Sequence, residues 1–254
     1  MTTSLERQWQ DFFWSGFYAK AWRSVIDPQK TQEEVTAVLK LLNPAPGSHI
    51  LDWCGGEARH SILLALQGYK VTLLDFAPNH IQTAREMAEQ AGVHLNLVCC
   101  DFRETPSFIQ ADCAINMFTA GIGYLTEEDD VQALKSLYAA LKPGAKFLLD
   151  TMNLFWLVRH YQPNSGEMAE KTGSWRKIEQ RRFDFWTNRN QAVILYWDKG
   201  GETIQETDLR IYSAAELIAV LRRAGFEPLQ LYGGFDGSPL GFDSRRLIIV
   251  SQRK

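Results

Sequence analysis

The stretch His49-Ile-Leu-Asp-Trp-Cys-Gly-Gly-Glu-Ala-Arg-His60 decides the fold of this chain. An apolar pair leads into Asp52 as in a buried parallel strand, small residues follow as in a tight turn, and a helix is expected from Ser61. A second strand ends in Asp75, about twenty positions after the turn, where nucleotide-binding folds place a carboxylate for ribose hydroxyls. The pattern therefore predicts a cradle for an adenosine-containing cofactor.

The spacing of small residues in the turn separates two kinds of cradle. The dinucleotide pattern Gly-x-Gly-x-x-Gly falls on Cys54, Gly56 and Arg59, so one glycine of three is present. The pattern Asp-x-Gly-x-Gly-x-Gly falls on Asp52, Cys54, Gly56 and Ala58, where every turn position is small. The second register fits better, because it keeps the central glycine where the backbone must approach a ligand.

Strands and helices alternate along the rest of the chain. Alternation of this kind predicts a parallel, doubly wound sheet, and two closing strands without a helix between them predict a terminal hairpin. The expected helices cover 78–91, 127–141 and 213–224, and the expected later strands cover 94–102, 112–118, 145–151, 226–232 and 245–251.

Six short motifs occur in a characteristic order. They are Ile-Leu-Asp52-x-Cys-x-Gly56, Val-Thr-x-x-Asp75, Cys-Asp101-Phe102, Ala-Ile-Asn116-Met-Phe118, Leu141-Lys-Pro-Gly144 with Leu-Leu-Asp150 following, and Ala224-Gly-Phe226. In this order they resemble the bacterial class I S-adenosylmethionine (SAM) methyltransferases that modify small molecules. The resemblance covers essentially the whole chain. It implies an α/β fold with a Rossmann-like, doubly wound seven-stranded sheet whose last strand is antiparallel.

The resemblance also implies where SAM binds. The turn would hold the methionine part, Asp75 the ribose, Asp101 with Phe102 the adenine, and an N-terminal tyrosine the methionine carboxylate. Asn116, Met117 and Phe118 would lie beneath the sulfonium. The alternatives are that the aspartates cap loops and the phenylalanines belong to the core. The complete set expected to bind the cofactor is Tyr18, Asp52, Cys54, Gly55, Gly56, Ala58, Asp75, Phe76, Asp101, Phe102, Asn116, Met117 and Phe118.

The reaction that the resemblance implies is in-line transfer of a methyl group to an oxygen or nitrogen of a small molecule, with S-adenosylhomocysteine as product. Such acceptors need a proton removed. Tyr124 and His160 are the catalytic candidates, and Tyr161 and Asp236 are weaker ones; for His160 the alternative is a solvent-facing helix histidine. Two other functions stay open: a SAM-binding protein with a non-methylating or regulatory role, and a nicotinamide-dependent oxidoreductase.

Composition agrees with one soluble enzyme domain over 1–254. The chain has 254 residues, with 27 Lys and Arg against 30 Asp and Glu and a net charge of −3, so nucleic acid is not an expected partner. No stretch is apolar enough to predict a signal peptide or membrane span, which predicts a cytoplasmic protein. Four cysteines and five histidines without ligand-type spacing predict no metal site.

Two segments lie outside the minimal fold, whose SAM-binding core is expected at 46–152 and whose C-terminal helix and hairpin at 213–254. The first is an N-terminal helical cap at 1–45, in which Trp9, Phe13 and Phe17 form a stripe; it either covers the core or also closes the cofactor site. The second is a three-stranded antiparallel insertion at 175–212, with strands at 177–186, 191–198 and 202–212. The insertion would roof the active site or form a homodimer surface.

Overall fold

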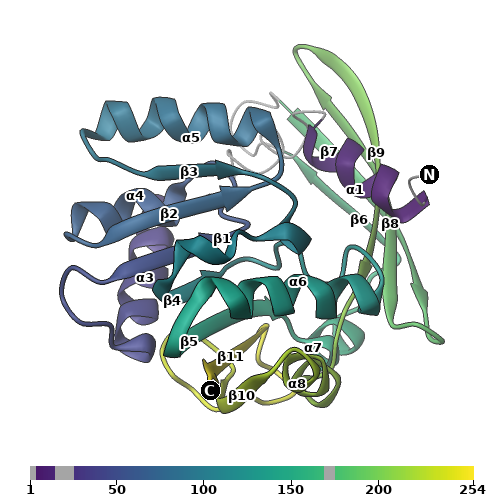
Figure 1. The fold of residues 1–254 in the computed structure, drawn as a ribbon. Coiled ribbons are helices and arrows are strands. Elements are labelled where there is room, and N and C mark those ends of the chain that lie inside the picture. Colours follow the sequence, from purple (N-terminus) through teal and green to yellow (C-terminus); the bar gives the residue numbers. More distant parts are fainter. Residues whose placement is uncertain (1–3, 15–25, 169–174) are drawn as a thin grey trace.

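A seven-stranded sheet with helices on both faces forms the body of the protein, and a smaller four-stranded sheet stands beside it (Figure 1). The computed structural model describes residues 4–14, 26–168 and 175–254. The strand order in the large sheet is β10-β11-β5-β4-β1-β2-β3. The first strand of the chain therefore lies inside the sheet, between β4 and β2, and the turn expected to bind a cofactor follows it.

The large sheet has the predicted doubly wound arrangement with an antiparallel last strand. Its parallel strands are β1 (His49–Trp53), β2 (Lys70–Asp75), β3 (Asn96–Cys99), β4 (Ala111–Asn116) and β5 (Leu141–Met152). The terminal hairpin consists of β10 (Phe226–Tyr232) and β11 (Arg246–Arg253), and β11 runs antiparallel to both β10 and β5.

Strand β5 begins four residues earlier than the sequence pattern indicates. The segment Lys142-Pro-Gly144 belongs to it, because Leu141 pairs with Ala111 and an irregularity in the register then absorbs the next residues. A turn signal of Pro and Gly was thus overridden by pairing at the start of a strand, where proline is tolerated.

Helices cover the two faces of the large sheet in two groups. On one face lie α6 (Glu127–Ala140) and α8 (Ala214–Arg223), each started by a capping box, at Thr126 with Asp129 and at Ser213 with Glu216. On the other face lie α3 (Pro28–Leu42), α4 (Arg59–Leu66) and α5 (Pro78–Ala91). A short helix α7 (Leu154–Arg159) follows β5, and 3-10 turns cover Phe102–Glu104 and Ser107–Ile109.

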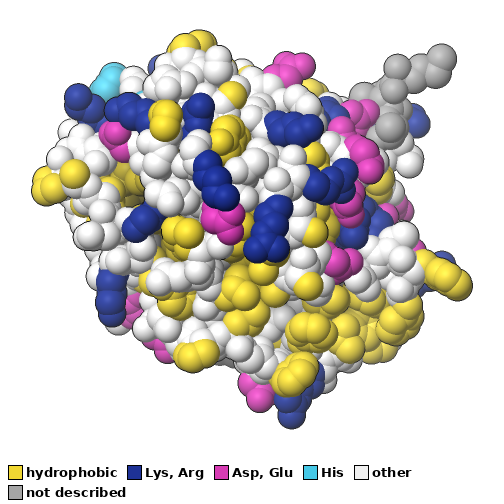
Figure 2. All heavy atoms as spheres, turned by 60° about the horizontal axis from the view of Figure 1, so that its bottom comes forward, with side chains coloured by type: hydrophobic (Ala, Val, Ile, Leu, Met, Phe, Trp, Pro, Cys, Tyr) yellow, Lys and Arg dark blue, Asp and Glu magenta, His cyan; other side chains and the backbone are white. Residues whose placement is uncertain are grey.

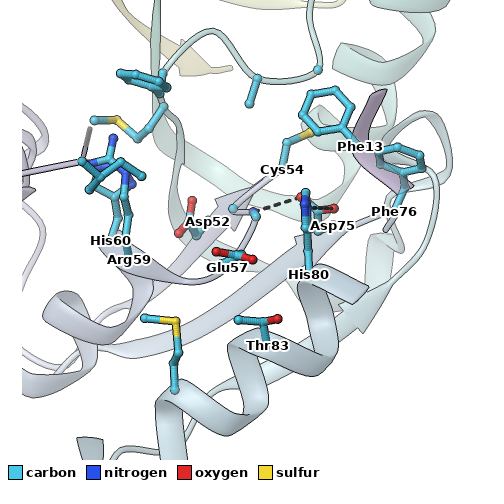
Figure 3. A pocket seen from close by; sticks show the side chains of 18 of the residues that line it. Phe13, Asp52, Cys54, Glu57, Arg59, His60, Asp75, Phe76, His80 and Thr83 are labelled. Atoms are coloured by element: carbon cyan, nitrogen blue, oxygen red, sulfur yellow. Dashed lines mark hydrogen bonds and ion pairs between the residues drawn. The ribbon is translucent and has the colours of Figure 1, made fainter. Parts of the chain in front are cut away.

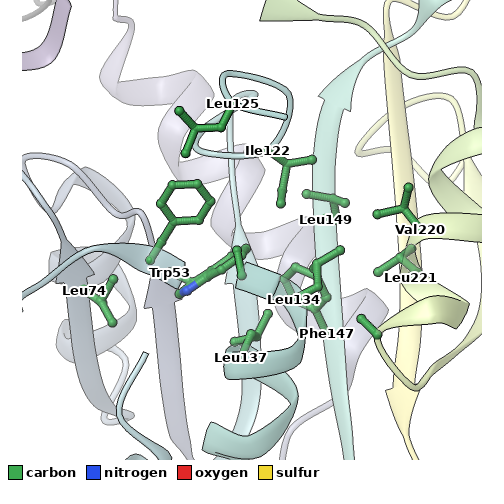
Figure 4. Close-up of a cluster of buried hydrophobic side chains, with 14 of the residues drawn as sticks. Trp53, Leu74, Ile122, Leu125, Leu134, Leu137, Phe147, Leu149, Val220 and Leu221 are labelled. Atoms are coloured by element: carbon green, nitrogen blue, oxygen red, sulfur yellow. The ribbon is translucent and has the colours of Figure 1, made fainter. Parts of the chain in front are cut away.

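The core has one cluster on each face of the sheet. Figure 4 shows part of the first, in which Trp53 and Phe147 of the sheet meet Leu134 and Leu137 of α6. The Trp53 side chain is fully buried and its Nε1 donates to Thr105 Oγ1 at 2.8 Å, so the indole nitrogen is satisfied inside the core. The core therefore fixes the end of β1, where the cofactor turn begins.

The smaller sheet has four antiparallel strands where the sequence predicts three. They are β6 (Asn164–Met168), β7 (Trp175–Asp184), β8 (Arg189–Asp198) and β9 (Gly201–Arg210). The first hairpin turn covers 185–188, two residues before the expected position, because the Asp184 carboxylate accepts bonds from Trp186 N and Thr187 Oγ1 and starts the turn there. Helix α1 (Ser4–Trp14) packs against β9 (Figure 1).

Candidate functional site

A cavity of about 620 Å³ lies at the carboxyl ends of β1, β2 and β4 (Figure 3). Helices α1, α4 and α5 contribute to its walls. Its size is that of pockets that hold a drug-sized ligand, and its position is where open α/β sheets bind nucleotides. The residues expected from the sequence that line it are Asp52, Cys54, Gly55, Gly56, Asp75, Phe76, Met117 and Phe118.

The turn after β1 takes the left-handed conformation at every second residue. The φ angles are 62° at Cys54, 57° at Gly56 and 71° at Ala58, the positions that the second glycine pattern marks. Glycine adopts this conformation without strain and other residues do so at a cost. A Cβ atom on Gly56 would meet no atom within 4 Å, so this backbone borders open space. The turn keeps the glycine conformations although two of the glycines are absent.

Asp52 presents a buried carboxylate to the cavity. Its Oδ2 accepts the Ser61 hydroxyl at 2.7 Å, while Oδ1 has no hydrogen-bond partner among the described residues. Burial raises the pKa of this carboxyl, against the influence of His60 and Ser61. An unpartnered buried acceptor is costly unless a ligand donor satisfies it, and the ammonium group of a methionine moiety is such a donor. The site therefore fits a cationic amino-acid group.

Asp75 is the organising carboxylate of the cavity. Its Oδ2 accepts Gly56 N–H at 2.9 Å, and its Oδ1 accepts Ala77 N–H at 3.0 Å and lies 3.2 Å from His80 Nδ1 (Figure 3). A carboxylate offers about four lone-pair sites, so Oδ2 retains the capacity for one further donor. Asp75 thus ties the turn to the start of α5 and still has an acceptor site left for a ligand hydroxyl.

The first turn of α4 borders the cavity without a side-chain cap. Ala58 stands at the N-cap position and has no polar atom to offer, so Arg59 and His60 bring an uncapped helix N-terminus to the wall. The side chains of both turn to Glu34 of α3, at 2.5 Å from Arg59 Nη1 and 2.8 Å from His60 Nε2. Although burial opposes it, these bonds lower the pKa of Glu34.

Phe118 stands at the rim of the cavity in a conformation that several groups hold. Its φ is 66°, its N–H donates to Asp150 Oδ2 at 2.9 Å, and the residue is 37% exposed. The guanidinium groups of Arg59 and Arg246 lie 5.2 and 5.7 Å from the ring centroid, and Arg246 forms a two-point ion pair with Asp150. A bulky residue in the left-handed conformation is strained, and strained residues of this kind are concentrated at functional sites.

Four other expected residues do not line the cavity and have structural contacts or conformations instead. Asp101 caps the 3-10 turn by accepting Arg103 N–H at 2.8 Å, and it also pairs with the Arg103 guanidinium. Phe102 is buried between Trp9 and Trp53. Asn116 donates to Trp53 O at 2.8 Å, while its Oδ1 has no partner among the described residues. The capping and core alternatives therefore describe Asp101 and Phe102 as they are placed here. Ala58 supports the turn by its conformation.

The candidate bases lie away from the cavity lining. His160 is exposed at the end of α7, where its Nδ1 bonds to Trp156 O at 2.9 Å, in agreement with the helix-surface alternative. The ring of Tyr124 packs edge-on against the ring of Phe13, with the two centroids 5.4 Å apart. Tyr18, the expected contact of the methionine carboxylate, lies outside the described residues, as does Phe17 of the predicted aromatic stripe.

Sequence patterns missed the side of the cavity formed by α5. His80, Thr83, Met87 and Gln90 recur at helical spacing and line the cavity with Glu86. The signal was present as a second stripe, beside the apolar stripe of Ile81, Ala84 and Ala88 that packs on the sheet. Periodicity identified the stripe facing the sheet but gave no reason to assign the other stripe to a ligand.

Residues 4–14, 26–168 and 175–254 contain no group of three or more His, Cys, Asp or Glu side chains placed to hold a metal ion. Over the same residues, no helix has the length and apolar character needed to cross a membrane.

Comparison with known proteins gives the same picture. The profile of the methyltransferase-domain family matches residues 50–144. A demethylmenaquinone methyltransferase of Listeria welshimeri is 33% identical over 216 residues, 82% of this chain and 83% of that protein. The tRNA 5-carboxymethoxyuridine methyltransferase of Escherichia coli is 25% identical over 167 residues, 64% of this chain and 63% of that protein. SAM-bound CalS10, an amino pentose methyltransferase of Micromonospora echinaspora, has a TM-score of 0.69 at 20% identity, covering 94% of this chain and 97% of that one.

The fold and the cavity define an α/β protein that binds a nucleotide-type cofactor at the carboxyl edge of a doubly wound sheet. The chain belongs to the class I SAM-dependent methyltransferases, and its cofactor is SAM.

Proposed function

We propose that the protein transfers the methyl group of SAM to an oxygen or nitrogen atom of a small-molecule acceptor. The observation that carries the proposal is the cavity at the turn after β1, where left-handed backbone, the Asp52 carboxylate and the Asp75 carboxylate converge. The regulatory alternative and the nicotinamide alternative are less well supported, because the turn has the methyltransferase spacing and the family is that of methyltransferases.

Different residues of the cavity bind different parts of the cofactor. Asp52 Oδ1 accepts the methionine ammonium group, the uncapped start of α4 faces the carboxylate, and Asp75 Oδ2 accepts a ribose hydroxyl. Met117 and Phe118 border the sulfonium end. SAM supplies an electrophilic methyl group on a good leaving group, so orientation in a water-poor pocket gives most of the acceleration and no covalent intermediate is needed.

A small acceptor fits the walls of the cavity. Apolar and aromatic side chains of α1, α5 and the β4 end, such as Phe13, Met87 and Phe118, line it together with carboxylates and the guanidinium of Arg59. By their names, the Listeria relative methylates demethylmenaquinone and CalS10 methylates an amino pentose, and both of these acceptors are small molecules. On the face seen in Figure 2, Lys and Arg side chains are scattered among acidic and apolar ones, unlike the continuous basic surface that binds a nucleic-acid backbone.

A transfer assay tests the proposal directly. The protein is incubated with methyl-labelled SAM and separate pools of amino sugars, quinols, phenols, amines and tRNA, and each pool is analysed for label and for S-adenosylhomocysteine. We expect labelled product from a small-molecule pool and none from tRNA. Label in tRNA alone would contradict the small-molecule assignment, and binding of SAM with no transfer to any pool would favour the regulatory alternative.

We also propose that residues 1–254 act as one domain and that the outer face of the smaller sheet contacts a second copy of the chain. Ile178, Leu195 and Ile204 are paired across three neighbouring strands, and Ile178 and Ile204 are 45% and 59% exposed. Light scattering on the wild type and on Ile204→Glu tests the contact. We expect a dimer that the substitution dissociates, and a wild-type monomer would contradict it.

A further inference from the structure

Aromatic side chains of α1 cover the ring of Phe76, which is next in sequence to Asp75, the carboxylate proposed to bind the ribose. The Trp9 ring stacks on the Phe76 ring with centroids 3.9 Å apart and planes 18° apart. Trp14 lies nearly parallel to it at 5.9 Å, and Phe13 meets its edge at 5.9 Å. Trp9 is 3% exposed and also touches Phe102 edge-on at 5.4 Å. One helix therefore fills the aromatic slot between Phe76 and Phe102.

This slot lies where the adenine of SAM is expected. Phe76 directly follows Asp75 and lines the cavity, so a base attached to a ribose at Asp75 comes within reach of the Phe76 ring. Bases bind proteins by stacking on aromatic faces. Indole and purine are both fused six- and five-membered rings. Two rings stacked at 3.9 Å leave no room for a third between them. A base can use this face of Phe76 only if Trp9 leaves it.

The polar side of the slot is held by the same helix. The carboxylate of Asp101 is engaged by the Arg103 guanidinium, with Nη2 at 2.7 Å from Oδ2 and Nε at 3.1 Å from each oxygen. Arg103 Nη1 in turn donates to Glu6 of α1 at 2.8 Å and to Asp129 at 2.9 Å. These bonds raise the pKa of Arg103, so the cation persists at every working pH. Glu6 thus fastens α1 to Arg103, and through Arg103 to Asp101, the residue that the resemblance assigns to the adenine.

We propose that α1 is a self-occluding lid, in which Trp9 occupies the adenine position and the Glu6–Arg103 ion pair latches the helix. The inference rests on the proposed binding of SAM in this cavity. The turn after β1 and Asp52 remain open to the cavity, so the methionine end binds without movement of α1. Entry of the base displaces Trp9 and releases Asp101. Because only open molecules bind the base, the apparent affinity for SAM is the intrinsic affinity multiplied by the fraction of molecules that are open.

Binding of S-adenosylhomocysteine and of adenosine tests the lid without knowledge of the acceptor. Titration calorimetry and stopped-flow mixing are applied to wild type, Trp9→Ala, Glu6→Gln and the matched control Asp11→Asn, which removes an exposed α1 charge with no bond to Arg103. We expect Trp9→Ala and Glu6→Gln to bind both ligands at least threefold more tightly. The wild-type observed rate should level off with ligand concentration, as a gated step requires, and Asp11→Asn should match the wild type.

The outcomes separate the lid from the cofactor assignment. Weaker binding of both ligands by Trp9→Ala, with Glu6→Gln unchanged, would overturn the lid and make Trp9 a wall of the base site. Glu6→Gln leaves the aromatic cluster intact, so it decides the question if Trp9→Ala does not fold. Failure of every variant to bind S-adenosylhomocysteine would instead overturn the cavity as the SAM site, and the lid with it.

Discussion

At the scale of the residue, backbone conformation identifies the cofactor turn better than the identity of its side chains. Cys54 and Ala58 adopt left-handed φ angles of 62° and 71°, although neither is glycine. Each costs about 1 to 2 kcal/mol relative to a residue without Cβ. The sheet on one side and α4 on the other impose the turn. The strain is tolerated because both residues are small and the surrounding core is fixed.

Substitution of Cys54 by glycine should leave cofactor binding nearly unchanged. Glycine removes the left-handed strain, which offsets the loss of a small, half-buried side chain, each effect being about 1 kcal/mol. Burial raises the pKa of the thiol well above its usual value, so no thiolate is lost. Calorimetry with SAM should give a dissociation constant within twofold of wild type, whereas Gly56→Ala should weaken binding. A tenfold loss in Cys54→Gly would show that the thiol contacts SAM.

Asp75→Ala should weaken SAM binding at least tenfold. The substitution removes the carboxylate that we propose accepts a ribose hydroxyl, and it frees Gly56 N–H and His80 Nδ1 from this partner. A hydrogen bond to a charged group contributes about 1.5 to 3 kcal/mol, which is about ten- to hundredfold in affinity. The exposed Glu89→Gln on α5 serves as control in the same titration. Unchanged affinity in folded Asp75→Ala would remove this residue from the site.

At the scale of the element, the loop after β4 joins the cavity to the smaller sheet. Gly121 packs against Cys54 Sγ, and a Cβ at this glycine would lie 2.8 Å from the sulfur. Two residues on, Gly123 accepts Arg210 N–H from the end of β9 at 2.8 Å. The same few residues therefore touch the cofactor turn and the smaller sheet. A shift of β9 would therefore move the loop after β4 and with it the wall of the cavity.

Gly123→Ala should destabilise the protein by about 2 to 3 kcal/mol. Its φ is 93°, and an added Cβ would overlap the carbonyl oxygen of Arg210. Gly144→Ala is the matched control, because Gly144 has a φ of 81° but open space around it. Urea unfolding should show the larger loss for Gly123→Ala. Equal losses would mean that backbone conformation alone matters and that the contact with β9 is soft.

At the scale of the whole molecule, a buried carboxyl links the two sheets. Asp130 of α6 accepts the Tyr212 hydroxyl at 2.6 Å and Gly123 N–H at 3.1 Å, and burial raises its pKa to about 7. Arg189 and Arg210, which both lower this pKa, approach from the smaller sheet. The junction between sheets therefore contains a group that is mostly protonated below neutrality.

Stability should fall as pH rises through the titration of Asp130. The folded pKa of about 7 lies above the usual value of 3.8, so the folded state holds a proton that the unfolded state has released. The stabilisation is complete below about pH 4 and is lost by pH 7 to 8, up to about 4 kcal/mol at 1.36 kcal/mol per unit. Asp130→Asn removes this dependence. Urea unfolding from pH 5 to 8 should show the wild type losing stability relative to Asp130→Asn, and parallel profiles would contradict the assignment.

Much of the fold could be predicted from the sequence because its signals are local. The limits of α5 follow from Pro78 at its start and Gly92 at its end, and β10 follows directly after Gly225, which ends the preceding helix. The strand β6 was missed, because a short edge strand without alternating apolar residues carries no local signal. For the candidate site, spacing in the sequence pointed to the turn and Asp75, which line the cavity, but it gave no indication of the wall formed by α5.

The sequence by itself determined the class of the protein, the order of its elements, and the turn and carboxylates that the structure brings together in one cavity. These depend on contacts between near neighbours, which periodicity and small-residue spacing encode directly. Only the tertiary structure decided that Trp9 and Glu6 of α1 meet Phe76 and Arg103, and that His160 lies on the surface. Those relations join segments far apart in the chain, and their geometry depends on how helices pack on the completed sheet.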